Sequence, residues 1–198
     1  MRSHRAAVLA TVMLLSPAFI AACGSSRSSP PNPAPSVASS PVPANRIDDF
    51  DLVDTHRFPV ADAGVQYRYQ DSSGRQADVY IYRGDAPRHG TDTTGALRAE
   101  VATFREALPL GVRRGYYTTY SIVSDSLITV RVAGRDYALH RITMAQTREG
   151  VARDSYFYLT VVGGEYVKVR ITQPPGKFSV ARADTFVRAV LEDAVRKM

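Results

Sequence analysis

The chain has 198 residues, of which 44% are hydrophobic, and a formal net charge of +6 from 25 Lys and Arg against 19 Asp and Glu. Its single cysteine excludes an intramolecular disulfide and any metal site built from paired cysteines. The basic residues are mostly arginine and are scattered along the chain, so the charge does not indicate a nucleic-acid surface, and we expect no nucleic-acid partner.

The first 22 residues have the layout of a secretory signal. Arg2 and Arg5 precede an uncharged, largely apolar run from Ala6 to Ile20, and small residues follow it. This run is shorter than the roughly 20 residues that a permanent membrane helix needs, and Pro17 interrupts it. We therefore expect residues 1–22 to be removed, which leaves 23 basic residues against 19 acidic ones and a charge of +4.

The residues around the expected cleavage point, Ile20-Ala21-Ala22-Cys23, resemble the lipobox of bacterial lipoproteins. The resemblance implies a covalent diacylglycerol on the Cys23 thiol and leaves an N-acyl chain open; we expect no other cofactor. Two acyl chains anchor a protein firmly, because one chain alone binds a membrane only marginally. The expected location is therefore the cell envelope, with the membrane as a partner through the lipid anchor.

The residue after the cysteine bears on which membrane is used. In Gram-negative lipoproteins an aspartate at this position favours retention in the inner membrane, and here the residue is Gly24. By this resemblance the outer membrane is favoured in a Gram-negative host, at its periplasmic face or at the cell surface.

Residues 23–45 comprise the cysteine and a tether that is almost wholly Ser, Pro, Ala and Gly, with one charge at Arg27. A segment of this composition cannot bury a core, so we expect it to stay disordered. Its prolines favour polyproline II, in which the tether would reach on the order of 70 Å at about 3.1 Å per residue. The tether would hold the following domain away from the membrane.

Residues 46–198 are expected to form a single globular domain. Val65–Gln70 and Ala77–Arg83 alternate apolar and polar residues on either side of the turn sequence Asp71–Gly74, which predicts a hairpin. Asp51–Phe58, before the hairpin, is a short strand or a loop.

Two helices flank a long run of strands in the rest of the domain. Apolar residues recur at helical spacing from Leu97 to Leu108, and Pro109 and Gly111 are expected to end this first helix. Ser179 is expected to cap a second helix with an apolar stripe from Val180 to Ala194. Between them we expect an antiparallel meander with the strands Tyr116–Ser124, Leu127–Val132, Asp136–Gln146, Arg153–Val162 and Tyr166–Thr172.

The last predicted hairpin leaves its register open. A two-residue Gly163-Gly164 loop pairs Val161 with Tyr166 and puts Lys168 and Arg170 on the face of the sheet that carries Phe157. A three-residue loop instead pairs Val161 with Val167. In either case both faces of the strand carry bulky side chains, so both need a cover.

The sequence therefore predicts the α+β class, with an antiparallel sheet of about six to seven strands and a helix on each face (α/β/α). This order of elements resembles the Mog1/PsbP-like fold, which includes several bacterial lipoproteins. Members of that fold act mainly as binding or assembly factors, so the resemblance implies no catalytic residues.

No catalytic or metal-binding motif is present in the sequence, so we expect no metal site and a non-enzymatic chain. His56 shares a predicted strand face with Asp54, His89 is expected in a loop, and His140 lies on an apolar strand face. An acidic cluster from Asp48 to Asp54 lacks the glycine and the final glutamate of an EF-hand loop.

The best candidate for a binding site follows the first predicted helix. It consists of Arg113, Arg114, Tyr116, Tyr117 and Tyr120. Arginine offers fork-shaped donors to carboxylate or phosphate, and tyrosine adds flat surface that packs on a sugar or a protein partner. Tyrosines in strands also pack on their own sheet, so the pattern is not specific to binding.

We expect a lipid-anchored, non-enzymatic binding or assembly module of the bacterial cell envelope, whose partner is an envelope protein, a glycan or a lipid. Two alternatives stay open. The first is an envelope hydrolase that uses His56 or His140 with a nearby carboxylate. The second is a carrier for a lipid or another apolar molecule, which requires a cavity of several hundred Å³.

Overall fold

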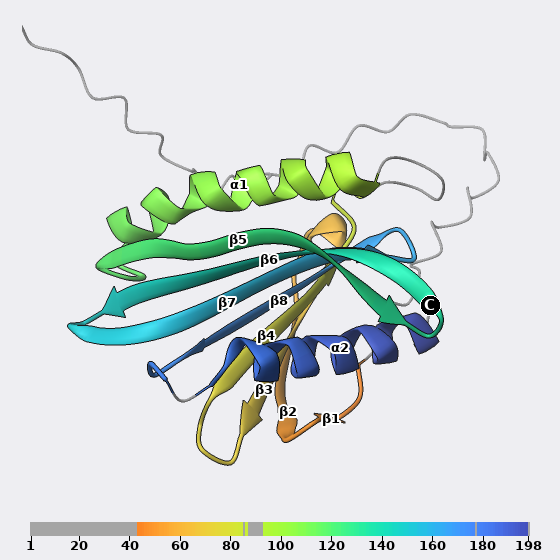
Figure 1. Cartoon of the computed structure of the whole chain (residues 1–198), viewed down its shortest axis with the longest axis horizontal. Coiled ribbons are helices and arrows are strands. Elements are labelled where there is room, and N and C mark those ends of the chain that lie inside the picture. Colours follow the sequence, from red (N-terminus) through yellow and green to blue (C-terminus); the bar gives the residue numbers. More distant parts are fainter. Residues whose placement is uncertain (1–42, 85, 87–92, 177, 198) are drawn as a thin grey trace, which may run out of the picture. The chain divides into compact units, whose positions relative to one another are not determined.

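The structure is a computed structural model that describes residues 43–84, 86, 93–176 and 178–197 (Figure 1). The expectations for the signal peptide, the lipid on Cys23, residues 24–42 of the tether and His89 lie outside these residues. In the described part the strands are β1 Arg46–Ile47, β2 Phe50–Arg57, β3 Val65–Asp71, β4 Gln76–Tyr82, β5 Thr119–Val132, β6 Arg135–Arg148, β7 Val151–Val162 and β8 Glu165–Gln173. The helices are α1 Thr93–Arg113 and α2 Val180–Lys197, and a 3-10 turn, η1, spans Ala61–Ala63.

The strands form one antiparallel sheet in the order β1-β2-β3-β4-β8-β7-β6-β5. The predicted α+β class with an antiparallel sheet is therefore confirmed. The predicted number of strands, about six to seven, is too low, since the described sheet has 8. A two-residue strand such as β1 is too short to leave a periodic pattern in the sequence.

Strand β5 corrects the prediction of two strands at Tyr116–Ser124 and Leu127–Val132. It runs unbroken from Thr119 to Val132 beside β6, and a bulge between Ile122 and Ser124 takes up the shift in register. The polar Asp125-Ser126 pair does not turn the chain, because the Asp125 carboxylate is held by Arg105 of α1 and His140 of β6.

Helix α1 also corrects a prediction, because it continues through Pro109 and Gly111 to Arg113. Gly111 is buried because Tyr117 packs against it: a Cβ built on Gly111 would overlap the Tyr117 side chain. The helix ends instead around Gly115, whose φ of 74° is the left-handed conformation that glycine favours, and the Tyr116 amide donates to the Gly111 carbonyl at 2.9 Å.

The β7–β8 hairpin has the two-residue Gly163-Gly164 loop, so Val161 pairs with Tyr166. This register places Lys168 opposite Leu159 and Arg170 opposite Phe157. The cations therefore lie on one face of the sheet, and the apolar side chains of β8 (Val167, Val169 and Ile171) lie on the other.

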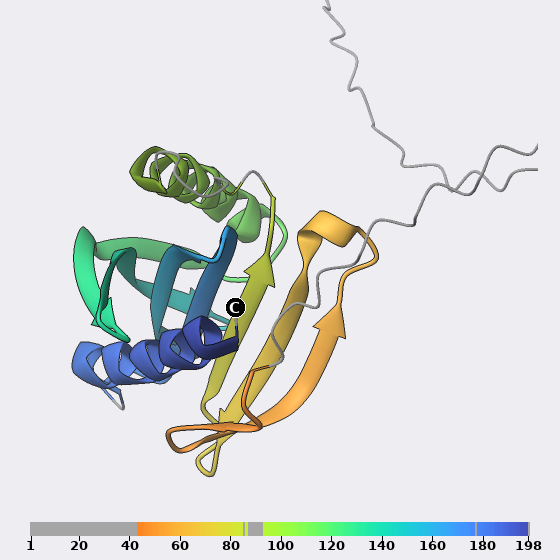
Figure 2. The ribbon, with the colours of Figure 1, turned by 90° about the vertical axis from the view of Figure 1, so that its right-hand side faces the viewer.

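The core consists of two clusters that take alternate residues of β7. Tyr156 and Tyr158 pack in the cluster that contains Phe186 of α2, while Phe157 and Leu159 pack in the cluster that contains Leu97 of α1. We call these two sheet surfaces the α2 face and the α1 face. In Figure 2, strands β5 to β8 run between the two helices. Neither helix has a stretch long and apolar enough to cross a membrane.

The chain before β1 is already fixed to the domain. The Ala44 amide donates to the Asp193 carboxylate near the end of α2 at 2.8 Å, and the Tyr69 hydroxyl donates to the Ala44 carbonyl at 2.9 Å. Pro43 is buried as well. The domain thus includes Pro43 and Ala44, which were expected to belong to the tether.

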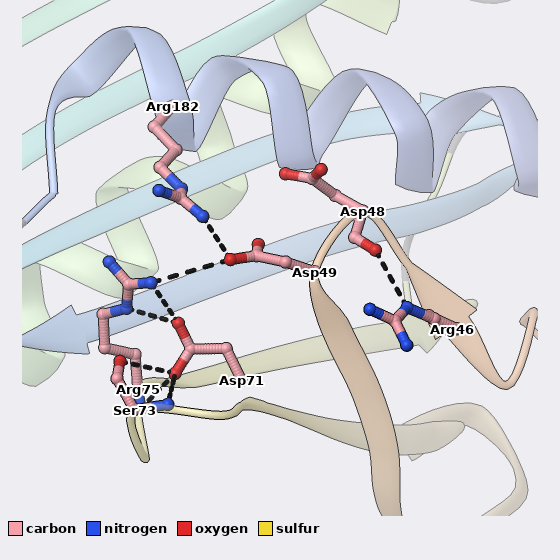
Figure 3. Close-up of polar contacts among 7 residues, drawn as sticks. All are labelled: Arg46, Asp48, Asp49, Asp71, Ser73, Arg75 and Arg182. Atoms are coloured by element: carbon pink, nitrogen blue, oxygen red, sulfur yellow. Dashed lines mark hydrogen bonds and ion pairs between the residues drawn. The ribbon is translucent and has the colours of Figure 1, made fainter.

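Asp49, from the acidic cluster, joins an ion-pair network (Figure 3). Its carboxylate pairs with Arg182 of α2 and lies 3.6 Å from Arg75 in the β3–β4 turn. Arg75 also binds Asp71, which accepts a further bond from the Ser73 amide at 2.9 Å. The network ties the β1–β2 turn, the β3–β4 turn and α2 together through arginines.

A candidate anion-binding hollow

Beyond the end of α1, the α1 face of the sheet forms a hollow of about 440 Å³. Its walls come from the loop after α1, from the β3–β4 turn and from strands β4, β6, β7 and β8. The lining residues are Gly74, Gln76, Asp78, Tyr80, Tyr116, Tyr117, Gln146, Arg148, Arg153, Arg170 and Thr172.

Three arginines from three neighbouring strands line this hollow. Arg148 ends β6, Arg153 lies at the start of β7, and Arg170 lies near the end of β8. Arg148 is also 3.5 Å from Glu149, but both side chains are exposed, and such surface pairs contribute little. Within the described residues no ion pair joins Arg153 or Arg170 to a carboxylate, so their charges are available to a ligand.

Asp78 is the one carboxylate among the residues that line the hollow, and its oxygens already accept hydrogen bonds from neighbouring side chains. It accepts hydrogen bonds from Gln66 at 2.9 Å, from Arg68 at 2.9 Å and from Gln76 at 3.0 Å. Arg68 therefore neutralises its charge, although Asp78 lies directly across from Arg170 in the β4–β8 register. The hollow keeps an excess of positive charge.

Arg170 has unused hydrogen-bonding capacity. Its Nε is buried and has no hydrogen-bond partner within the described structure. A buried donor without a partner is unfavourable, and an anion bound in the hollow would satisfy it. Because a guanidinium group binds a carboxylate or phosphate through two parallel hydrogen bonds, Arg170 suits either anion.

Tyrosines supply the walls beside the arginines. Burial raises the pKa of the Tyr117 hydroxyl, and the nearby Arg170 partly offsets this shift. Burial and then the Asp78 charge raise the pKa of Tyr80, against smaller opposite effects of Arg170 and Arg68. Both hydroxyls are therefore protonated at neutral pH, and the Tyr117 hydroxyl donates to the Leu108 carbonyl at 2.7 Å.

A second, smaller hollow of about 230 Å³ adjoins the first at its helix side. The two share Tyr116, Tyr117 and Arg170. The rest of its lining is mainly apolar and comes from α1: Phe104, Ala107, Leu108, Leu110 and Gly111, with Arg114. A charged hollow and an apolar one thus lie side by side at the end of this helix.

The residues of the predicted binding patch are distributed unevenly around these hollows. Tyr116, 61% exposed, and Tyr117, 5% exposed, line both hollows, and Arg114 lines the apolar one. The Tyr120 ring packs edge-on against Tyr117 at 5.8 Å and lines another depression. Arg113 is the exposed last residue of α1.

Sequence reasoning missed the three arginines that define the charged hollow. Arg148, Arg153 and Arg170 lie on separate strands, and no spacing in the sequence links them. The two-residue β7–β8 loop offered one signal, because it puts Arg170 on the same face as Phe157. Arg153 shares this face by simple alternation along β7.

His140, a candidate base, is a buried residue in contact with the Asp125 carboxylate. Its Nε2 lies 2.6 Å from the Asp125 carboxylate, which also binds Arg105 of α1. His140 is 8% exposed between the cross-strand neighbours Leu127 and Leu159, and its Nδ1 has no hydrogen-bond partner within the described structure. Burial alone would raise the pKa of Asp125, but the hydrogen bonds from Arg105 and His140 lower it.

His56, the other candidate base, lies on β2 and packs edge-on against Phe58 at 4.8 Å. It is exposed and pairs across the sheet with Gln66, while Asp54 pairs with Arg68. His56 and Asp54 thus share a strand face. Within the described ranges, no group of three His, Cys, Asp or Glu side chains is arranged to hold a metal ion.

Comparison with known proteins adds little to this description. No protein-family model matches the chain, and no curated protein matches it. Among solved structures, a crystal structure of PA94 from Pseudomonas aeruginosa, a protein of unknown function, is similar with a TM-score of 0.36 and 11% sequence identity. The match covers 72% of this chain and 81% of that chain.

Proposed function

We propose that the chain is a lipid-anchored, non-enzymatic binding module of the bacterial cell envelope, and that the charged hollow is its ligand site. The ligand presents a carboxylate or a phosphate to Arg153 and Arg170. The observation that carries the proposal is that three arginines line a hollow in which the one lining carboxylate, Asp78, is already bound by Arg68.

The anchor is proposed from the sequence. The lipobox at Ile20 to Cys23 supports a diacylglycerol on Cys23, and Gly24 supports the outer membrane of a Gram-negative host. Contacts of Ala44 with Asp193 and Tyr69 support a fixed attachment point for the tether at one end of α2.

We also propose the α/β/α arrangement of the Mog1/PsbP-like type for the domain. The separate core clusters of α1 and α2, which take alternate residues of β7, support one helix on each face of the sheet. Members of that fold act mainly as binding or assembly factors, which agrees with a site that carries donors and no nucleophile.

The described contacts favour neither alternative function. A hydrolase needs a base within reach of its substrate. His140 is buried and its Nε2 is bound to Asp125, while the exposed His56 lines neither of the two hollows. A lipid carrier needs a large apolar cavity, whereas the 440 Å³ hollow is lined by arginines and the apolar one has about 230 Å³.

The test is binding of inorganic phosphate and of acetate to the purified lipidated protein in non-ionic detergent, measured by calorimetry at low salt. Low salt preserves the attraction of exposed charges. Arg153→Gln and Arg170→Gln should each weaken binding by about tenfold or more, because a hydrogen bond to a charged group contributes about 1.5–3 kcal/mol.

The matched control is Arg135→Gln, an exposed arginine at the opposite end of β6 from Arg148. It should leave the affinity for both anions unchanged. Equal affinities in the wild type and in both hollow variants would show that the hollow does not bind anions and would refute this function.

A further inference from the structure

The two adjoining hollows share one wall, so a single ligand can occupy both. Arg170 lines the charged hollow and the apolar one, and so do Tyr116 and Tyr117. Tyr117 is fixed by its hydrogen bond to the Leu108 carbonyl, whereas Tyr116 is largely exposed. The anionic end of a molecule held by Arg170 would therefore lie next to an apolar recess.

Apolar side chains are left in contact with solvent around this recess. Leu110 is 40% exposed. Ala107, three residues earlier in α1, is also exposed and lines the same recess. Contiguous apolar surface beside well-placed polar groups is typical of small-molecule sites, where the apolar part gives affinity and the polar part fixes orientation.

We propose that the ligand is a small organic anion with an apolar group, such as an aryl or short alkyl phosphate or carboxylate. Its anionic group binds Arg153 and Arg170, and its apolar group enters the recess along α1 formed by Ala107, Leu108 and Leu110. This inference rests on the proposed function, because it assigns the chemistry of the ligand at the same site.

The volumes agree with a small ligand. The recess of about 230 Å³ accommodates a group such as a single ring, and the charged hollow of about 440 Å³ accommodates the anion with its water. Arg114 at the recess adds a further positive charge at this end of α1.

The experiment compares two matched pairs of probes on the lipidated full-length mature protein by calorimetry. The pairs are inorganic phosphate with phenyl phosphate, and acetate with phenylacetate. In at least one pair the phenyl compound should bind about tenfold more tightly than its parent anion, because the ring leaves water for the recess.

Two variants separate the recess from the charged hollow. Ala107→Phe fills the recess and Leu110→Ser makes its wall more polar, so each should reduce the gain from the phenyl group while leaving the parent anion unaffected. Val60→Ser, at a side chain that is 64% exposed and lines neither hollow, is the control and should keep the gain.

The outcomes distinguish the two proposals. Parent anions that bind through Arg153 and Arg170 without any gain from the phenyl group would overturn the inference and leave the proposed function standing. Parent anions that bind independently of both arginines would overturn the two together. Binding of the unacylated Cys23→Ser protein to phosphatidylglycerol vesicles, without any gain from the phenyl group, would identify a lipid surface as the ligand and also overturn the inference.

Discussion

At the scale of single residues, charged groups in this domain are stabilised by several donors at once. The Asp71 side chain is 0% exposed, yet it accepts hydrogen bonds from the Ser73 amide, the Ser73 hydroxyl and the Arg75 amide at 2.8–2.9 Å. Burial alone would raise the pKa of this carboxyl, but the bonds from Arg75 and Ser73 outweigh it and lower the pKa below its usual value.

This depressed pKa predicts a loss of stability in acid. The unfolded chain takes up its proton near pH 3.8, before the folded chain does. Stabilisation by Asp71 is therefore complete above that pH and is lost as the pH falls through the lower folded value. The free energy of unfolding in urea, measured from pH 6 to pH 2.5, should fall less steeply with acidification in Asp71→Asn than in the wild type.

Asp136→Asn is the matched control, because Asp136 is exposed and has no ion pair within the described residues. It should keep the acid dependence of the wild type. Asp125, whose pKa is also lowered, contributes in the same pH range, so Asp71→Asn should reduce the dependence and not abolish it. An unchanged pH profile in Asp71→Asn would contradict the role assigned to its hydrogen bonds.

At the scale of elements, the end of α1 shapes both hollows. Tyr117 folds back over the helix, packs on Gly111 and donates to the Leu108 carbonyl. The helix tolerates Pro109, two residues before Gly111, although proline removes a backbone donor. Close packing of Tyr117 on the glycine fixes the wall that the two hollows share.

This packing reverses the usual effect of a glycine substitution. Alanine in place of glycine normally stabilises a helix interior by about 1 kcal/mol. Gly111→Ala should instead destabilise the protein by roughly 1–3 kcal/mol in urea unfolding, because its Cβ would overlap the Tyr117 ring.

The control is the same substitution in a Tyr117→Ala background, where the overlap is absent. There Gly111→Ala should be neutral or stabilising, so that the double-mutant cycle reports a coupling between the two positions. A stabilising effect of Gly111→Ala in the otherwise unchanged protein would show that Tyr117 does not pack on this glycine.

At the scale of the whole molecule, the proposed lipid anchor and tether would decide where the hollows can meet a ligand. Cys23 lies outside the described residues, whereas the domain's own contacts begin by Ala44. The proposed function therefore combines a sequence signal at one end of the chain with a site that only the folded domain creates.

Cys23→Ser should prevent acylation and release the protein from the membrane fraction, because the thiol is the point of attachment. Fractionation of cells with mass spectrometry of the purified protein measures both effects, and Ser26→Ala in the same tether is the control that should stay membrane-bound. An unmodified Cys23 sulfur, or a leader still attached to the mature wild-type protein, would disprove the anchor.

Local patterns in the sequence were enough to predict the elements with strong periodicity and the antiparallel α+β class. The β3–β4 hairpin and the second helix follow from alternation and from helical spacing, because these signals depend on neighbouring residues. The lipobox-like run from Ile20 to Cys23 is also a short, contiguous signal, and the lipid anchor that it indicates stays a prediction. Of the site, the sequence indicated Tyr116 and Tyr117, which directly follow a recognisable helix.

Tertiary structure alone decided the rest. Gly111 was expected to end the first helix, but it lies inside that helix and packs against Tyr117. The two strands predicted on either side of Asp125 are one strand, in which His140 and Arg105 bind the Asp125 carboxylate. The arginines of the charged hollow come together only through the pairing of β6, β7 and β8. Strand register depends on contacts between distant residues, so the charge of a binding site built across strands cannot be read from any one of them.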